Sequence, residues 1–416
     1  MDHAIGVRAA QLRMAHRALE DTARQMFEER LDREIEPEFA VELDSVGRST
    51  GVEREISDEE TIREPFDPEK IDVATRTPTV DLLLARIRRG ALDLQPDFQR
   101  LAGIWTQQAQ SRLIESMLLR LPLPTFYAAE ADDARWVMVD GVQRLTAMAR
   151  FIDPESIGAA PLTLKHLEYL GPDYEGKRFA DLPGRLQTRL LETELVVHLI
   201  RQGTPEPVMF SIFARINTGG RPLTRQELRH ALIPGPARSL LHELAESEPY
   251  QKATLGSVSP ERMDDREMVL RFIAFRLTEP DHYNRRDFDD FLRDAMHEIN
   301  RLSGTQVSRL REEFSRAMEA AREIFGQWAF RKFVGGHRRS PINKALFEAV
   351  AVGLARRSDR ELALLRERRE EVLARLFTLI REHDFERAIS YSTGDIVKVH
   401  RRFKAVDMTL REVAGD

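Results

Sequence analysis

The residue types best suited to phosphate chemistry lie together at DGVQR (140–144), where a predicted strand ends and a predicted helix begins. The first N–H groups of a helix have no backbone acceptor and carry a partial positive charge, so such a turn attracts phosphate or carboxylate groups. Gly141 permits a close backbone approach, Gln143 and Arg144 could bind phosphate oxygens, and Asp140 could hold a divalent cation or orient a water molecule. A structural alternative also fits, in which Arg144 pairs with a carboxylate at the end of the strand.

Two further segments contain similar groups. PDFQR (96–100) has a carboxylate, an amide and a guanidinium, and the turn NTGG (217–220) presents successive N–H groups that could form an anion-binding nest. Each segment also has a purely structural interpretation. PDFQR could be a polar loop that Phe98 anchors in the core. NTGG could be a turn that leads into the next helix, because Thr224 and Glu227 form a capping box directly after it. If the sheet brings its strand ends together, these segments could face a common cleft.

The elements that must position these segments are short and mixed between residues 73 and 235. Apolar spacing predicts helices at 80–89, 106–120, 145–151 and 206–214, and strands at 91–95, 125–129, 135–139 and 194–200. After Pro236 the pattern predicts long helices, at 237–247, 264–277, 286–302, 305–329, 341–356 and 359–382. The predicted fold class is therefore α+β, with a small mixed-sheet domain at 73–235 and an all-α domain at 236–416.

Residues 1–72 have a different character. Apolar residues at three- and four-residue spacing predict a helix at 8–31, which could dock on a partner or on its own protein. The stretch 32–70 is acidic and interrupted by proline and glycine, which predicts a tether. Between Asp32 and Asp72 there are 15 acidic and 5 basic residues, so this tether could lie over a basic surface.

Length and composition exclude several classes of protein. A chain of 416 residues, of which 42% are hydrophobic and 32% charged, suits two globular domains. It has no cysteine, which excludes disulfides, thiolate metal sites and a cysteine nucleophile. No apolar run reaches the length of about 18–20 residues that spans a bilayer, and no signal peptide is evident. We expect a soluble cytoplasmic protein with no membrane partner.

The C-terminal region is basic. From Phe330 to Arg411 there are 19 lysine or arginine residues against 11 acidic ones. The densest run predicts nucleic-acid contacts from Lys398, Arg401, Arg402 and Lys404. An ordinary charged surface on an arginine-rich helical domain would give the same pattern.

Four motifs in this order resemble the DUF262 group, the GmrSD-type N-terminal domain with a ParB/sulfiredoxin-like fold. They are PDFQR (96–100), IESMLLRLPLP (114–124), VDGVQRLTAM (139–148) and FARINTGGRPLTRQE (213–227). The resemblance covers approximately residues 73–235 and is looser in the helical half.

The resemblance implies an NTP-binding or NTP-hydrolysing domain that acts in bacterial defence against foreign DNA, coupled in some relatives to nucleic-acid cleavage. The family's DGQQR motif is its nucleotide and catalytic signature. The implied cofactors are an NTP and Mg²⁺. The resemblance thus implies catalytic roles for Asp140, Gln143 and Arg144, with Asp140 also the metal ligand, and nucleotide contacts from Asp97, Gln99, Arg100, Gly141, Asn217, Thr218, Gly219 and Gly220.

The sequence departs from the family pattern at Val142, which replaces the first glutamine of DGQQR. Valine can neither donate nor accept a hydrogen bond, so one contact is missing and binding is favoured over hydrolysis. The late histidines are dispersed, so the His-Asn-His nuclease domain of larger relatives is not expected. A Walker A loop is also absent from the sequence, so a nucleotide would have to bind at the DGVQR motif.

Three functions remain open. The first is a Mg²⁺-dependent nucleoside triphosphatase whose turnover gates DNA cleavage, with Arg100 and Arg144 on the phosphates and Asp140 on the metal or water. The second is a sensor that binds nucleotide or DNA without turnover. The third is a scaffold or homo-oligomer in which helix 8–31 recruits a separate nuclease or effector.

Overall fold

The computed structural model describes residues 40–44, 47–56, 71–94, 105–131, 134–216, 223–285, 287–333 and 339–415, and side chains at 214–216 are not among them. The helix predicted at 8–31 and the segments PDFQR and NTGG lie outside these residues.

The N-terminal part contains a five-stranded mixed sheet, as the α+β prediction expects. Its strands have the order β3-β7-β5-β6-β4, in which β7 and β5 run parallel, β6 and β4 run parallel, and the other two pairs are antiparallel. The strands are β3 (Val73–Arg76), β4 (Leu92–Asp93), β5 (Phe126–Glu130), β6 (Trp136–Asp140) and β7 (Val197–Ile200). All four predicted strands are confirmed. The edge strand β3 was not predicted, because three of its four residues are exposed and it has no apolar run.

One face of this sheet is covered by helices that form their own apolar core. Leu83 and Leu84 of α2, Ile114 of α4 and Leu145 of α5 are buried there against Met138 of the sheet. The helices are α2 (Val80–Arg88), α4 (Gln107–Leu118), α5 (Val142–Ile152) and α7 (Gly184–Leu191), with the short α6 (Gly171–Tyr174) beside them. The first three were predicted, whereas the short, arginine-containing α7 was not.

The rest of the described chain is almost entirely helical, which confirms the second half of the fold prediction. Its helices are α8 (Glu206–Ile216), α9 (Arg225–Leu232), α10 (Pro236–Glu246), α11 (Glu248–Thr254), α12 (Asp264–Leu277), α13 (Phe288–Ile299), α14 (Gly304–Phe325), α15 (Lys344–Ala355), α16 (Asp359–Glu367), α17 (Arg369–Arg381), α18 (His383–Ser390) and α19 (Ile396–Ala414). The single helix predicted at 359–382 is wrong, because the backbone leaves the helical region at Arg368. The Arg368 guanidinium donates to the carbonyl of Val413 at 2.8 Å, which ties this break to the end of α19.

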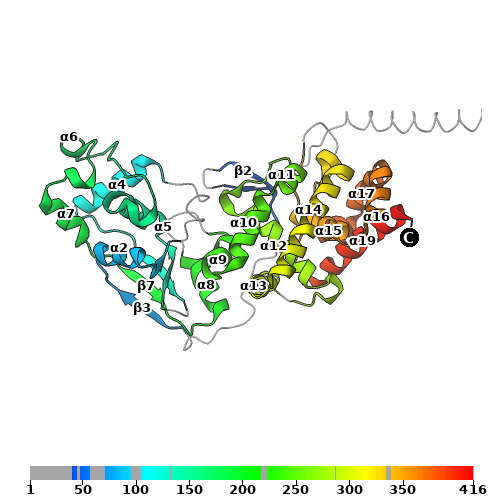
Figure 1. Ribbon diagram of the computed structural model, residues 1–416, viewed down its shortest axis with the longest axis horizontal. Coiled ribbons are helices and arrows are strands. Elements are labelled where there is room, and N and C mark those ends of the chain that lie inside the picture. Colours follow the sequence, from blue (N-terminus) through cyan, green and yellow to red (C-terminus); the bar gives the residue numbers. More distant parts are fainter. Residues whose placement is uncertain are drawn as a thin grey trace, which may run out of the picture.

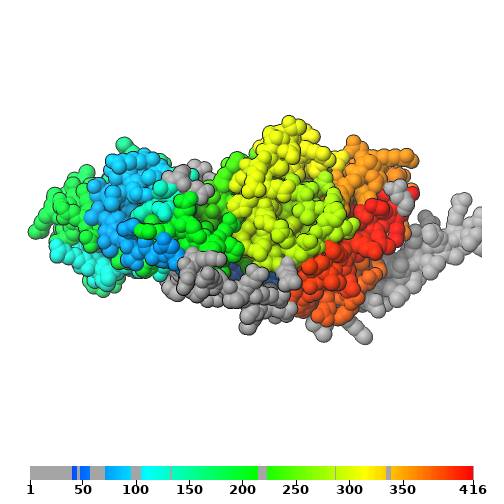
Figure 2. Space-filling model, turned by 90° about the horizontal axis from the view of Figure 1, so that it is seen from below, coloured from blue at the N-terminus to red at the C-terminus, as the bar shows by residue number. Residues whose placement is uncertain are grey.

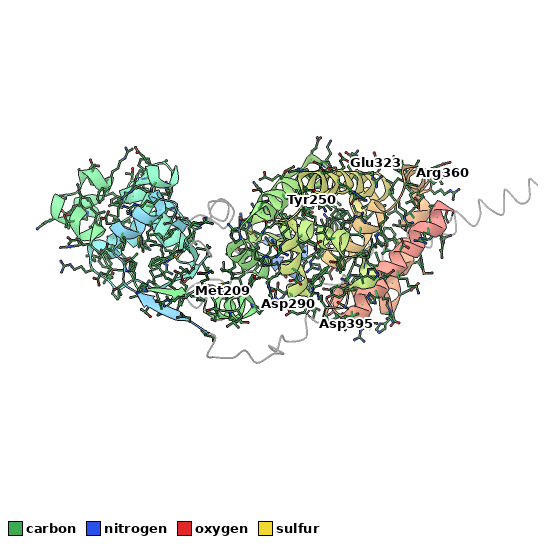
Figure 3. The ribbon with its side chains drawn as sticks, turned by 60° about the horizontal axis from the view of Figure 1, so that its bottom comes forward. Met209, Tyr250, Asp290, Glu323, Arg360 and Asp395 are labelled. Atoms are coloured by element: carbon green, nitrogen blue, oxygen red, sulfur yellow. The ribbon has the colours of Figure 1, made fainter. Side chains whose placement is uncertain are left out.

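The sheet lies between two apolar cores. Its second face contributes Ala129, Val139 and Ile200 to the large core of the helical region. Figure 1 shows the sheet with α2, α4, α5 and α7 at one end of an elongated molecule and α14 to α19 at the other, with α8 and α9 between them. Met209 of α8 lies at this junction (Figure 3) and packs on the large core. The second face of the sheet therefore packs at the junction between the two parts.

Within the stretch predicted as a tether (32–70), the structure describes residues 40–44 and 47–56, which we call the N-terminal hairpin segment and which pack as a hairpin instead. The other residues of the predicted tether lie outside the described residues. Strands β1 (Val41–Leu43) and β2 (Ser49–Glu53) pair antiparallel, and Val52 is fully buried in the helical core. Glu53 Oε1 accepts a hydrogen bond from Lys332 Nζ at 2.7 Å, and the two carboxylate oxygens of Glu55 lie 2.8 and 2.5 Å from the Arg271 guanidinium. The acidic side chains of this segment therefore neutralise buried cations of the helical region.

No helix within the described residues is both long and apolar enough to cross a lipid bilayer.

Candidate functional site

The turn between β6 and α5 depends on a glycine. Gly141 has a φ of +97°, and a Cβ at this position would lie 2.3 Å from Cδ1 of Phe126. Residues other than glycine rarely adopt this backbone conformation, so the turn excludes a side chain on two grounds. Among the described residues, no side chain caps the N-terminus of α5, so none of them supplies an acceptor to the first N–H groups of this helix.

Arg144 does not extend toward an open cleft. Its guanidinium donates to the Pro124 and Thr125 carbonyls, and its Nη2 lies 3.1 Å from Oδ2 of Asp140. The group also lies over the Phe126 ring, with 4.4 Å between the guanidinium carbon and the ring centroid. Burial lowers the pKa of Arg144, and the nearby Asp140 carboxylate opposes that shift. The phosphate contact predicted for Arg144 does not match this geometry, because two carbonyls and Asp140 take three of its five N–H groups and the Asp140 carboxylate neutralises its charge.

Arg144 instead holds Asp140 in place. The Asp140 side chain is 35% exposed, whereas that of Arg144 is 10% exposed. The ion pair therefore presents the carboxylate to solvent and keeps the guanidinium behind it. The metal ion or water predicted at Asp140 stays a prediction, and Arg144 lies where it can orient this carboxylate.

Polar side chains from three neighbouring strands lie in register with Asp140. Asp140 is paired with Tyr127, Tyr127 with His198, and His198 with Thr75. The Tyr127 and His198 rings are 5.2 Å apart, and His198 Nδ1 lies 3.1 Å from the Thr75 hydroxyl. This row was not predicted, because the cross-strand register that aligns it cannot be read from one strand at a time.

The described flanks of the other two motifs lie close to the same turn. The backbone N–H of Trp105, which follows PDFQR, lies 3.4 Å from Oε1 of Gln143. Leu223, which follows NTGG, packs against both apolar cores, and the next residue, Thr224, caps α9 with Glu227 in the predicted capping box. The chain thus brings the ends of all three motifs to one region. Asp97, Gln99, Arg100, Asn217, Thr218, Gly219 and Gly220 themselves lie outside the described residues.

Val142, the departure from the family motif, is 4% exposed and belongs to the core that covers the sheet. Its side chain faces away from the solvent side of the turn. A valine at this position therefore contributes to packing, and the polar groups at the surface of the turn are those of Asp140 and Gln143.

The four basic residues predicted to contact nucleic acid are not all on the surface. Lys404 and Arg401 are exposed, with Arg401 paired to Asp384 at 2.9 Å, and the Lys398 ammonium donates to the Tyr391 carbonyl at 2.8 Å. Arg402 is fully buried and forms an ion pair with Glu348, which is also fully buried. A nucleic acid cannot reach Arg402, which removes it from the candidate contact surface.

Metal ligands are sparse around Asp140. Among the residues that the structure describes, no three His, Asp or Glu side chains gather closely enough to hold a metal ion. Mg²⁺ commonly uses one or two carboxylates together with substrate phosphates and water. Asp140 alone could therefore serve a Mg²⁺ ion that arrives with a nucleotide.

The sequence motifs did not predict an arginine-lined hollow of about 550 Å³ at the opposite end of β6. It is lined by Arg76, Arg86 and Arg201 together with Trp136 and Glu130. The Arg86 guanidinium carbon lies 4.2 Å from the centroid of the Trp136 ring, and Arg201 is 3.7 Å from Asp72. The several arginines at the end of α2 could have indicated a basic surface in the sequence. The arginines of the hollow lie in or directly after different strands and helices, so the strand register was needed to predict that they lie together.

A comparison with protein families agrees with the resemblance that the ordered motifs indicate. Residues 80–234 match the family described as GmrSD restriction endonuclease, N-terminal domain. This part of the chain is similar to a GmrSD N-terminal domain. The match implies a restriction or defence context for the protein, and it ends just before α10, where the long helical half begins. The comparisons with curated proteins and with solved structures found no match.

Proposed function

We propose that this GmrSD-type protein binds a nucleoside triphosphate, with Mg²⁺, at the β6–α5 turn, and that this binding controls its action in defence against foreign DNA. The observation that carries the proposal is the uncapped N-terminus of α5 directly beside a solvent-facing carboxylate. Anionic phosphates suit the first, and a phosphate-bound Mg²⁺ suits the second.

Each residue of the β6–α5 turn has a separate role in the proposed site. Gly141 allows the phosphates to approach the backbone, Gln143 offers an amide, and Asp140 would reach the metal or an attacking water. Arg144 positions Asp140 and fixes the Pro124–Thr125 carbonyls. Mg²⁺ would neutralise the charge that develops on a transferred phosphoryl group. Turnover is the finer part of the proposal, and binding without turnover would leave a nucleotide sensor.

The test is a binding and turnover screen of the full chain with all four NTPs, with and without Mg²⁺. We expect one NTP to bind more tightly when Mg²⁺ is present. Asp140→Asn should abolish that dependence on Mg²⁺ and lower any turnover by about 100-fold or more, because one charged group at the reacting centre is lost. Arg144→Ala should lower both binding and turnover, because Asp140 loses its anchor.

Asp153→Asn is the matched control. Asp153 lies at the other end of α5 and pairs with Arg88 at 2.7 Å, so it is also a carboxylate held by an arginine. Binding in this variant should equal that of the unaltered protein. If Asp140→Asn and Asp153→Asn behave alike, or if none of the four NTPs binds, the proposal fails.

The arginine-lined hollow favours a second candidate function, in which the protein senses DNA directly. Three guanidinium groups line the hollow with one carboxylate, that of Glu130, and Arg201 also pairs with Asp72, so a net positive charge remains. Trp136 adds an aromatic surface. Phosphate contacts and aromatic stacking together are typical of proteins that bind single-stranded nucleic acid.

Salt titration of DNA binding tests this function. Each arginine that neutralises a phosphate adds about 0.7–0.9 to the slope of log K against log salt concentration. We expect Arg76→Ala to reduce the slope by about that amount, and Lys404→Ala on α19 to leave it unchanged. A slope that depends on Lys404 and not on Arg76 would transfer the DNA contact to the C-terminal helix. Figure 2 shows how far the region of α2, in blue, lies from α19, in red.

A further inference from the structure

Arg331 is a buried cation without an acidic partner among the described residues. Its relative exposure is 4%, and its guanidinium donates to the carbonyls of Ser340 and Thr254 and to the Ser257 hydroxyl. All three acceptors are neutral. Burial and the nearby Arg339 lower the pKa of Arg331 to about 10. An isolated buried charge is unfavourable unless a counter-ion compensates it.

Seven other buried basic side chains of the helical region are compensated, whereas Arg266 lies against the imidazoles of His230 and His242. Each of the seven has a carboxylate within 4 Å, and they are Arg229, Arg271, Arg293, Lys332, Lys344, Arg357 and Arg402. Arg331 therefore differs from these seven residues, and it lies next to an opening.

That opening is a hollow of about 400 Å³ between the N-terminal hairpin segment and the loop that leads into α15. Ser49 and Gly51 line it from β2, Ser257 from the other side, and Arg331, Arg339 and Ser340 from the loop. Figure 1 shows β2 beside α11 in this part of the molecule. Arg339 is exposed and adds a second positive charge to the mouth of the hollow.

The three serine hydroxyl groups that line the hollow differ in their hydrogen bonds. Those of Ser257 and Ser340 donate to backbone carbonyls, and Ser257 also accepts from Arg331, so these residues hold the guanidinium in place. The Ser49 oxygen accepts a hydrogen bond from the Gly51 backbone at 3.1 Å, which leaves its hydroxyl hydrogen to donate. Donors from Ser49, Arg331 and Arg339 therefore surround a space with no described acidic side chain in its lining.

We propose that this hollow binds a phosphate group. Two guanidinium groups and a hydroxyl donor match the charge and the several acceptor oxygens of phosphate. The volume exceeds that of one phosphate ion and falls within the range of small-molecule sites, so the phosphate can belong to a nucleotide or to a nucleic-acid backbone. The site is separate from the β6–α5 turn, because its residues come from β2 and from the helical region.

The test is the binding of inorganic phosphate to the full chain at constant ionic strength, measured by calorimetry and by the shift in melting temperature. We expect phosphate to raise the melting temperature of the unaltered protein, since a ligand that binds only the folded state stabilises it. Arg339→Ala and Ser49→Ala should each weaken binding, the former about tenfold or more. Both residues are accessible, so neither variant should impair folding. Arg331→Gln should abolish binding, with circular dichroism as the check on its fold.

Two control variants make the result specific. Arg322→Ala removes an exposed arginine from α14 and should leave phosphate affinity unchanged. Asp153→Asn, which removes a carboxylate from the sheet-containing part, lies outside both proposed sites and should also leave phosphate affinity unchanged. Equal affinity in Arg339→Ala and the unaltered protein, or the absence of phosphate binding, would overturn the proposal.

Competition identifies the source of the phosphate. Displacement of inorganic phosphate by a nucleoside monophosphate would assign the site to a nucleotide, and displacement by a short DNA duplex would assign it to the nucleic-acid backbone. Retention of phosphate against both would leave the inorganic ion as the ligand.

Discussion

Replacing Arg402 with methionine is expected to lower the free energy of unfolding by about 3–5 kcal/mol, because a buried carboxylate loses its hydrogen-bonded guanidinium. The Arg271 guanidinium would remain, 3.6 Å from Glu348 Oε2. Arg402 and Glu348 are both fully buried, and Arg402 Nε donates to Glu348 Oε1 at 2.9 Å. The guanidinium also donates to the Thr393 carbonyl at 2.6 Å, so the substitution removes a backbone partner as well. Since most domains are stable by only about 5–15 kcal/mol, the variant should unfold at a much lower denaturant concentration.

Arg401 provides a control one residue away. Its side chain is 45% exposed and pairs with Asp384 on the surface, so Arg401→Ala should change stability by no more than about 1 kcal/mol. The double variant Arg402→Met with Glu348→Gln should recover part of the loss, because no unpaired charge remains. Urea denaturation followed by circular dichroism measures all three variants. Equal effects of Arg401→Ala and Arg402→Met would contradict the burial of the pair.

Two adjacent arginines thus have opposite environments, which the charge pattern did not distinguish. The apolar residues of α19 recur at three- and four-residue spacing, and Arg402 lies within that stripe beside Val399, Phe403 and Val406. A helical pattern at 396–414 would have placed Arg402 on the buried side. Counting charges along a segment without assigning its helix obscured the difference.

Gly141→Ala is expected to destabilise the protein by about 2–5 kcal/mol and to weaken nucleotide binding at least tenfold. About 1–2 kcal/mol would come from placing a Cβ at positive φ and about 1–3 kcal/mol from overpacking against Phe126. Phe126 is fully buried and has the Arg144 guanidinium over its ring, so it has little room to move away. Movement of that ring would disturb Arg144 and, through it, Asp140.

Gly90→Ala separates the two contributions. Gly90 also has a positive φ, of +66°, but a Cβ there would meet no atom within 4 Å. This variant should show only the smaller backbone cost and bind nucleotide normally. Thermal denaturation and NTP calorimetry on both variants give the comparison, and equal losses of stability would exclude a contact between residue 141 and Phe126.

Much of the fold followed from local patterns, because most predicted helices and strands have clear apolar periodicity. The mixed sheet, the helical second half and the strand–turn–helix at DGVQR were all predicted. Contacts distant in sequence were not. Nothing in the local sequence shows that Arg144 turns back to the Pro124 carbonyl, or that His198 aligns with Tyr127 across the sheet. The stretch 32–70 was predicted to be a tether because it is acidic and interrupted by proline and glycine. Glu53 and Glu55 nevertheless pair with Lys332 and Arg271, which lie 279 and 216 residues further along the chain.

The attachment of β2 to the helical region affects how the protein can be dissected. A protein that begins after residue 70 would lack Glu53 and Glu55. Lys332 and Arg271 would then lose these two carboxylate partners. If such a truncated protein no longer bound a partner, two explanations would fit equally well. Either the C-terminal half is destabilised, or the predicted recruitment helix at 8–31 is missing. Shortening the chain no further than residue 39 keeps the two effects apart, and expressing the helical half by itself would require supplying β2 as a separate or fused peptide.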